Sequence, residues 1–388
     1  MISSTPWIAL TALALQSIAN IPTNATSAIQ ELDDTKRVRS DQWHLAFLQA
    51  DAAQKISQGK GVIVAVPDTG TEPHPDLRRN LLTGIDVIPG GSGDGQTDRD
   101  SHGTGMAGLI AAHGRDNKVG ALGIAPMAKI LPIFNSPPHG DGDPEALAQG
   151  IEYAILNGAD VISISSVGGA SPRLQQAVRR AVASNIVVVA AAGNLPQDAE
   201  VGYPAIEEGV LAVGGIDRNG NHAAISTTGP EVDIAAPAVD IYSTSINGKY
   251  RRGTGTSDAT AIVAGAAALV RSKYPDLPAS EVVHRLTATA VDKGPPGRDD
   301  EYGYGVVDLV AALTADVPPV GFESATAGAP GATGPTTAAV AEPAGGGDGG
   351  ATARGLATLG VIVAAAGAWA LVARRRRSSD DPPPRMSR

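Results

Sequence analysis

Three short motifs of the chain each contain a residue type used in acid–base or nucleophilic chemistry. Asp68 stands in Asp-Thr-Gly, His102 in Ser-His-Gly-Thr-Gly, and Ser257 in Gly-Thr-Gly-Thr-Ser. A serine hydroxyl becomes a good nucleophile when an imidazole accepts its proton, and that imidazole must be oriented by a third group. Together the three residue types predict acyl transfer, with Asp68, His102 and Ser257 as the catalytic residues.

Each motif also has an ordinary explanation when it is read alone. Asp68 could belong to an acidic turn, or to an aspartic protease, although those enzymes need two adjacent carboxylates and the chain has one Asp-Thr-Gly. His102 could be a structural histidine in a glycine-rich loop, and Ser257 could be the N-cap of a helix. The catalytic interpretation therefore depends on the three motifs being close in space.

A fourth polar residue, Asn194, follows Ala-Ala-Gly directly after an apolar run. Its side-chain amide could donate a hydrogen bond to an oxyanion, as could the backbone N–H groups near Ser257. Asparagine after glycine is also common in turns. We predict that Asn194 forms part of an oxyanion hole.

Three acidic residues in the glycine-rich loop before His102 are possible calcium ligands, namely Asp94, Asp98 and Asp100. Calcium needs six to eight oxygen ligands, and the spacing gives no complete set. We favour a solvated loop. No metal and no cofactor are predicted.

The elements that must position these residues follow from the hydrophobic pattern. Short apolar runs alternate with amphipathic stretches, which is typical of an α/β domain with a parallel sheet. The predicted buried strands are 61–66, 129–134, 161–164, 186–191 and 210–213. Helices are predicted from an Asp143 N-cap to Leu156 and over 259–274, and the catalytic domain spans 58–316.

Both ends of the chain differ from this middle region. Residues 1–28 contain an apolar stretch followed by polar turn residues, which favours a signal peptide over a buried helix. Residues 355–373 carry no charge and are long enough for a transmembrane helix; a core helix of a soluble domain is the alternative. Residues 29–57 form an N-terminal extension, and 317–354 a Gly/Pro/Ala-rich linker.

Four arginines follow the apolar segment, at 374–377. The positive-inside rule places the tail, 374–388, in the cytoplasm and the catalytic domain outside, so we expect a single-pass protein of the cell membrane. The net charge of −10 argues against a nucleic-acid partner. The chain has no cysteine, which excludes disulfides and thiol nucleophiles.

Together, the motifs resemble those of the subtilase family of serine proteases, whose triad runs in the order Asp, His, Ser. This resemblance implies a three-layer subtilisin-like domain, with a mainly parallel central sheet and helices on both faces. It also implies that Asp68 orients His102, that His102 is the general base, that Ser257 is the nucleophile and that Asn194 lines the oxyanion hole. His74-Pro75-Asp76-Leu77 and Gly123-Ile124-Ala125-Pro126 are similar to family segments without chemistry of their own.

Within this family the chain is most similar to the mycosins, membrane-anchored subtilases associated with type VII secretion. Gln42-Trp43-His44-Leu45, the short N-terminal extension, the linker and the C-terminal apolar segment carry this resemblance, whereas the absence of cysteine departs from it. The resemblance implies protein or peptide substrates and secretion-system membrane proteins as partners.

The resemblance also implies that a peptide substrate pairs with the backbone near Ser166, Val167 and Gly168. Small residues there predict room for a moderate or large apolar side chain, although the segment is one residue longer than the family pattern. Asp258 stands where the family usually has an apolar residue, and Ala261 where a proline is usual. A carboxylate so close to an oxyanion hole could oppose the developing negative charge, unless it points away.

Two alternatives stay open, and the first of them belongs to a different class of function. A structural partner of a secretion complex could keep the fold with weak turnover, and a broad surface scavenger protease could use the same residues. Our prediction is an extracytoplasmic, membrane-anchored serine endopeptidase.

Overall fold

The computed structural model describes residues 35–115, 119–138 and 142–320. The predicted signal peptide, most of the linker, the transmembrane segment and the tail lie outside these residues. Within the described ranges, no helix is both long and apolar enough to cross a bilayer.

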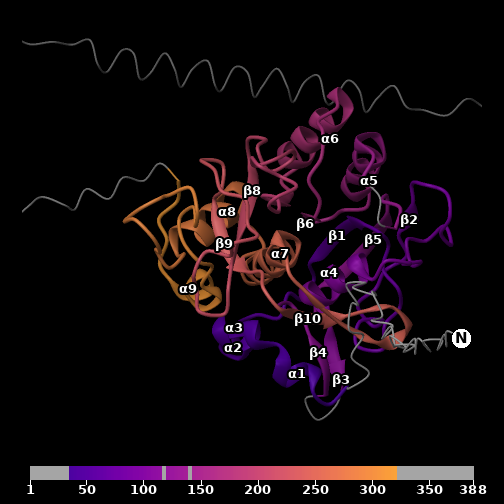
Figure 1. The fold of residues 1–388 in the computed structure, drawn as a ribbon, viewed down its shortest axis with the longest axis horizontal. Helices are drawn as coiled ribbons and strands as arrows, with labels where there is room; N and C mark the ends of the chain where they lie inside the picture. The colour runs from indigo at the N-terminus through magenta and orange to yellow at the C-terminus, as the bar shows by residue number, and fades with distance from the viewer. Residues whose placement is uncertain (1–34, 116–118, 139–141, 321–388) are drawn as a thin grey trace, which may run out of the picture. The chain divides into compact units, whose positions relative to one another are not determined.

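The centre of the fold is a seven-stranded parallel sheet in the order β2-β5-β1-β6-β7-β8-β9 (Figure 1). Its strands are β1 (Ile63–Asp68), β2 (Ile85–Asp86), β5 (Lys129–Phe134), β6 (Val161–Ile164), β7 (Val187–Ala191), β8 (Val210–Ile216) and β9 (Ile234–Pro237). The five predicted strands are confirmed, with ends that differ by a few residues. The short strands β2 and β9 were not predicted from the sequence.

Helices cover both faces of the sheet, as predicted. The principal ones are α4 (His102–Ala111) and α7 (Thr256–Lys273) on one face, and α5 (Pro144–Leu156) and α6 (Pro172–Ala183) on the other. Alternate residues of β1 explain this division, because Val64 and Val66 pack in the core of α4 and α7 while Ala65 packs in the core of α5 and α6. A three-layer α/β domain results.

Helix α5 begins where the sequence predicts. The Asp143 carboxylate accepts a hydrogen bond from the Glu145 N–H at 2.9 Å, and Pro144 occupies the first helical position. Helix α7 begins three residues earlier than predicted, at Thr256, so Ser257 lies inside its first turn. Two further helices, α8 (Ala279–Ala288) and α9 (Leu309–Thr314), follow it.

The N-terminal extension is packed against the catalytic domain. Its described part forms α1 (Val38–Asp41), α2 (Trp43–Phe47) and α3 (Ala50–Ile56). Gln42 is buried, and its amide group donates to the carbonyls of Leu122 and Tyr242 and accepts from the Leu122 N–H. The extension is therefore part of the same folded unit.

Two small antiparallel hairpins lie outside the main sheet: β3 (His113–Arg115) with β4 (Val119–Leu122), and β10 (Ile241–Thr244) with β11 (Tyr250–Gly253). The β10–β11 hairpin packs against α4, which carries His102.

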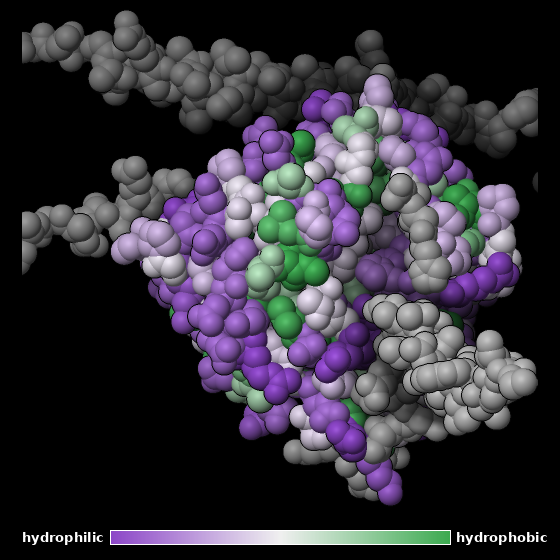
Figure 2. Space-filling model, in the orientation of Figure 1, coloured by the Kyte–Doolittle hydropathy of each residue, from purple (hydrophilic) through white to green (hydrophobic). Residues whose placement is uncertain are grey.

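In the view of Figure 2, hydrophobic residues on the surface form small patches separated by hydrophilic ones.

Candidate active site

Asp68 is the last residue of β1, at the carboxyl edge of the parallel sheet. This edge is where open α/β sheets place functional groups. Asp68 Oδ1 accepts hydrogen bonds from the Thr69 N–H at 2.7 Å and from His102 Nδ1 at 2.8 Å. The side chain of Asp68 is buried. The structure thus brings together two residues that lie 34 positions apart in the sequence.

His102 is the first residue of α4, and 28% of its side chain is exposed. The glycine after it is required by close packing, because a Cβ on Gly103 would lie 2.0 Å from the Gly70 carbonyl oxygen. The Gly103 N–H donates to the hydroxyl of Thr69 at 3.0 Å. The loop that contains Asp68-Thr69-Gly70 therefore packs closely against the start of α4 and is hydrogen-bonded to it. These contacts hold the imidazole of His102 beside Asp68.

Asp98 is a positioning residue whose role the sequence did not predict. Its buried carboxylate accepts from the N–H groups of Asp100, Ser101 and Thr104 and from the hydroxyls of Thr69 and Thr104, at 2.6–3.0 Å. These donors surround the first turn of α4. Asp98, which the sequence offered as a possible calcium ligand, thus accepts hydrogen bonds from protein groups. Within the described ranges, no cluster of three His, Asp or Glu residues is arranged to hold a metal ion.

Burial and charge act in opposite directions on His102. Burial lowers its pKa, but the charge of Asp68 and the hydrogen bond to it raise the pKa by more, so the pKa of His102 lies above its usual value of 6.5. The hydrogen bond at Nδ1 leaves Nε2 as the nitrogen that can accept a proton. This is the arrangement that a general base needs.

Ser257 is the second residue of α7. Its Oγ donates to the Ser165 carbonyl at 2.9 Å, and the Ser165 hydroxyl donates back to the Ser257 carbonyl at 3.2 Å. The hydroxyl proton is therefore directed at Ser165 and not at His102. Ser165 lines the same groove as Asp68 and His102, a cavity of about 190 Å³, so the third motif is hydrogen-bonded to a residue of the groove that contains the first two. Catalytic hydrogen bonds often form only when substrate is bound.

Asn194 lies beside the start of α7. Its Oδ1 accepts from the Thr256 N–H at 2.9 Å, and its own N–H donates to Asp198 at 2.8 Å. The side-chain oxygen of Asn194 thus caps the helix. A close approach by Gly255, whose Cβ would lie 3.3 Å from Asn194 Oδ1, keeps the amide at the helix terminus.

The segment with Ser166, Val167 and Gly168 forms an isolated antiparallel bridge with Tyr203, through the Gly168 N–H and the Tyr203 carbonyl at 3.1 Å. Val167 packs over Gly202, where an added Cβ would lie 2.1 Å from Val167 Cγ1. These three residues line a surface hollow together with Leu147 and Tyr203, and Ser166 also lines the groove of Asp68 and His102.

The carboxylate of Asp258 is buried and paired with an arginine. Its side chain is 2% exposed, and its Oδ1 lies 3.3 Å from Nη1 of Arg251 on β11. Burial raises the pKa of Asp258, and the charges of Arg251 and His102 lower it. The guanidinium compensates the buried carboxylate, so the expected repulsion at the oxyanion hole is offset.

The comparisons with known proteins agree with this geometry. Residues 59–305 match the model of the subtilase family, and the chain belongs to that family of serine endopeptidases. It is 42% identical to Subtilisin DY from Bacillus licheniformis over 274 residues, which is 69% of this chain and 97% of that enzyme. Subtilisins use an Asp-His-Ser triad.

Among solved structures, the fold is similar to those of two mycosins. MycP1 from Mycobacterium smegmatis is 31% identical with a TM-score of 0.64, over 74% of this chain and 89% of that one. MycP3 from a type VII (ESX-3) secretion system is 35% identical with a TM-score of 0.61, over 71% and 88%. The resemblance to subtilases and to mycosins is confirmed.

Proposed function

We propose that the protein cleaves peptide bonds through an acyl-enzyme on Ser257. The observation that carries this proposal is the 2.8 Å hydrogen bond between His102 Nδ1 and Asp68, in a groove that also contains the Ser165 partner of Ser257. A fixed imidazole with a raised pKa can accept the Ser257 proton and return it to the leaving amine.

In this mechanism the Ser257 hydroxyl turns from the Ser165 carbonyl toward Nε2 of His102 as the substrate binds. Ser257 Oγ then attacks the carbonyl carbon, and the tetrahedral oxyanion accepts hydrogen bonds from Asn194 Nδ2 and the Ser257 N–H. Collapse of the intermediate expels the amine, which takes its proton from His102. Water, activated by the same imidazole, hydrolyses the ester.

A second function has support from one observation. Because the Ser257 hydroxyl donates to the Ser165 carbonyl and not to His102, a structural partner of a secretion complex with weak turnover stays a candidate. The two functions predict different rates for the same isolated chain.

Hydrolysis of denatured casein, followed by mass spectrometry of the products, separates these functions. We expect turnover by the wild type, a loss of at least about 10³-fold in Ser257→Ala, and no change in Ser184→Ala, which alters an exposed serine at the end of α6. Absence of cleavage by the wild type would favour the structural partner. Full activity in Ser257→Ala would favour an aspartic protease built on Asp68.

The cellular setting forms a further part of this proposal. The uncharged segment 355–373 and the arginines after it support a membrane anchor with the catalytic domain outside the cytoplasm. Similarity to MycP3 from a type VII secretion system supports a role in that pathway. Deletion of 355–388 should move the active protein from the membrane fraction to the soluble fraction. Retention in the membrane would contradict the anchor.

A further inference from the structure

The carboxylate of Asp258 is buried directly behind the nucleophile. Asp258 follows Ser257 on α7, and within the described residues it forms an ion pair with Arg251 of β11, at 3.3 Å between Oδ1 and Nη1. Arg251 is itself 12% exposed. Burying two charges costs desolvation free energy unless the charges are paired with good geometry. A specific role for the pair would explain why two charged residues are buried at this position.

Two glycines shape the slot that holds this pair. A Cβ on Gly105 would lie 2.6 Å from both Cδ and Nη1 of Arg251, and a Cβ on Gly253 would lie 2.5 Å from Oδ2 of Asp258. Gly105 belongs to α4, one helical turn after His102. The guanidinium is therefore inserted between the helix that carries the base and the helix that carries the nucleophile.

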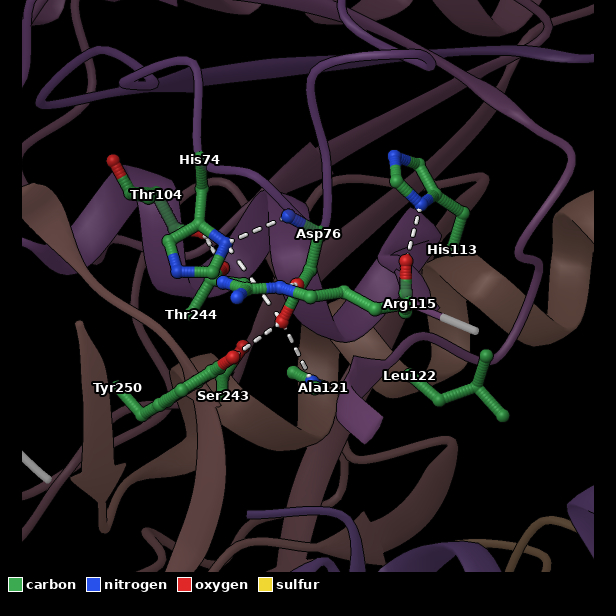
Figure 3. Close-up of polar contacts among 12 residues, drawn as sticks. His74, Asp76, Thr104, His113, Arg115, Ala121, Leu122, Ser243, Thr244 and Tyr250 are labelled. Atoms are coloured by element: carbon green, nitrogen blue, oxygen red, sulfur yellow. Dashed lines mark hydrogen bonds and ion pairs between the residues drawn. The ribbon is translucent and has the colours of Figure 1, made fainter. Parts of the chain in front are cut away.

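The hairpin that carries Arg251 is also attached to α4. Ser243 Oγ donates to the Gly105 carbonyl at 2.6 Å, and Thr244 Oγ1 donates to the Thr104 carbonyl at 2.7 Å. Figure 3 shows these threonines and Ser243 beside the buried His74 and Asp76. The β10–β11 hairpin thus supports the first turns of α4 and reaches α7 through Arg251.

A second buried carboxylate holds the other side of the hairpin. Asp76 accepts hydrogen bonds from Tyr250 of β11 at 2.8 Å, from the Ala121 N–H at 2.8 Å and from Arg115 Nε at 2.6 Å (Figure 3). Tyr250 and Arg251 are neighbours on one strand, so their side chains point in opposite directions. The hairpin is fixed on one side while it presents Arg251 on the other.

We propose that Arg251 and Asp258 are a positioning pair, which holds α7 against α4 so that Ser257 and His102 meet, and which balances the charge around the imidazole. This inference rests on the proposed function of Ser257 and His102.

Three charged groups, each on a different element, have the main effects on the charge of His102, and Asp100 of the loop before α4 lines the same groove. Asp68 of β1 and Asp258 of α7 raise the pKa of His102, and Arg251 of β11 lowers it. Removal of the Asp258 charge alone leaves Arg251 unopposed, so the pKa of His102 should fall. Removal of both charges should cancel most of that change.

The test uses the full chain with three changes: Asp258→Asn, Arg251→Gln and the double variant, which keeps a neutral hydrogen-bonding pair of similar size. We expect kcat of Asp258→Asn to fall about ten-fold, within the 10²-fold that a 1 Å misplacement can cost, with KM unchanged. The acidic limb of its kcat/KM profile should move to lower pH by roughly half a unit or more. In the double variant the limb should return toward the wild-type position.

Arg252→Gln is the matched control, because Arg252 lies on the same strand in an exposed pair with Asp240. It should leave kcat and the pH profile unchanged. Arg251→Lys keeps the charge and provides a second variant if Asp258→Asn does not fold; its kcat should fall while its acidic limb stays in place.

Wild-type kcat and an unmoved acidic limb in folded Asp258→Asn would overturn the positioning pair. The positioning pair would also be overturned if the acidic limb of the kcat/KM profile were displaced as far in the double variant as in Asp258→Asn. An inactive wild type, in contrast, would refute the proposed function itself, so the two failures are distinguishable.

Discussion

The helices α4 and α7 begin with the predicted base and the predicted nucleophile, but their first turns are held in different ways. The first turn of α4 is fixed by neutral donors that converge on one buried carboxylate, Asp98. The first turn of α7 is fixed by the amide oxygen of Asn194 and by a buried ion pair between Arg251 and Asp258. Both helices are therefore anchored by residues from other elements.

This difference matches what each helix must do. At α4, the N–H groups of Gly103 and Thr104 are bound by Thr69 and Asp98, so the turn is closed and the imidazole beside it is held still. At α7, Asn194 binds the Thr256 N–H. The Ser257 N–H is another of the first four that a helix cannot satisfy internally, and in the proposed mechanism it donates to the oxyanion.

The largest expected effect comes from breaking the Asp68–His102 hydrogen bond. In Asp68→Asn, kcat should fall by about 10³- to 10⁴-fold, because the imidazole loses its orientation and the stabilisation of its charged form. The pKa of His102 is raised above 6.5 in the wild type, so activity should fall as the pH drops through that raised value. In the variant, the acidic limb of any residual activity should move to lower pH.

Rates measured across a pH series check this prediction, with Asp276→Asn, at an exposed residue, as the control. A kcat of Asp68→Asn within ten-fold of the wild type would show that the hydrogen bond in the structure has no catalytic role.

A smaller effect is expected at the start of α7. Asn194→Ala should lower kcat by about 10²-fold with little change in KM, which is typical of losing one oxyanion donor. The loss of the Thr256 cap should also reduce the free energy of unfolding by about 1 kcal/mol. Steady-state kinetics and urea unfolding measure the two consequences separately, and the exposed Asn219→Ala is the control. Unchanged kcat would remove Asn194 from the oxyanion hole.

At α4, Asp98→Asn removes the charge and keeps the size of the side chain. At least one of the five donors around Asp98 should lose its acceptor, which lowers the free energy of unfolding by about 1–3 kcal/mol. We expect kcat to fall about ten-fold through displacement of His102. A variant with wild-type stability in urea would show that the carboxylate charge is not needed to hold this turn.

The smallest effect on activity is expected from substitution of His44. This residue lies on α2, far from α4 and α7 in the sequence. This side chain is fully buried, neither ring nitrogen has a hydrogen-bond partner among the residues that the structure describes, and burial lowers its pKa from 6.5 to about 3. The unfolded chain therefore binds a proton below pH 6.5 that the folded protein excludes. Above pH 6.5, where His44 is neutral in both states, it does not lower the free energy of unfolding. As the pH falls from 6.5 toward 3, protonation of His44 in the unfolded chain lowers the free energy of unfolding.

His44→Met should remove this acid sensitivity and leave kcat at pH 8 unchanged. Between pH 7.5 and pH 5, wild-type unfolding free energy should fall about 2 kcal/mol further than that of the variant. Urea midpoints at the two pH values measure this, with His284→Gln on α8 as the control. Equal acid sensitivity in wild type and His44→Met would show that His44 accepts a proton in the folded state.

The sequence predicts the central strands of the sheet and the proximity of Asp68 to His102 well, because both arise from local patterns. Continuous apolar runs mark the five central strands, and glycines mark the tight approaches around His102 and Ser257. The short strand β2 has no such pattern, since it consists of only Ile85 and Asp86. The β10–β11 hairpin was not predicted because its strand β11 is short and carries two arginines, so it lacks an apolar run.

Long-range polar contacts were the least predictable part of the site. Asp98 looked like one of three loop acids, and only the fold shows that Thr69 and Thr104 reach it. The sequence showed that Asp258 stands where the family usually has an apolar residue. Nothing in the sequence around Arg251 indicated that it pairs with Asp258. Residues whose role is set by a distant partner need the tertiary structure, because nothing in their neighbourhood along the chain encodes that partner.

The central claim is that Ser257 is a nucleophile activated by His102. A fluorophosphonate probe, with mass spectrometry of the labelled peptides, tests it most directly. We predict a single covalent adduct on Ser257 in the wild type, none in Ser257→Ala, and labelling of His102→Ala that is slower by at least about 10²-fold. A folded wild type that is never labelled, or labelled His102→Ala at the wild-type rate, would contradict the account.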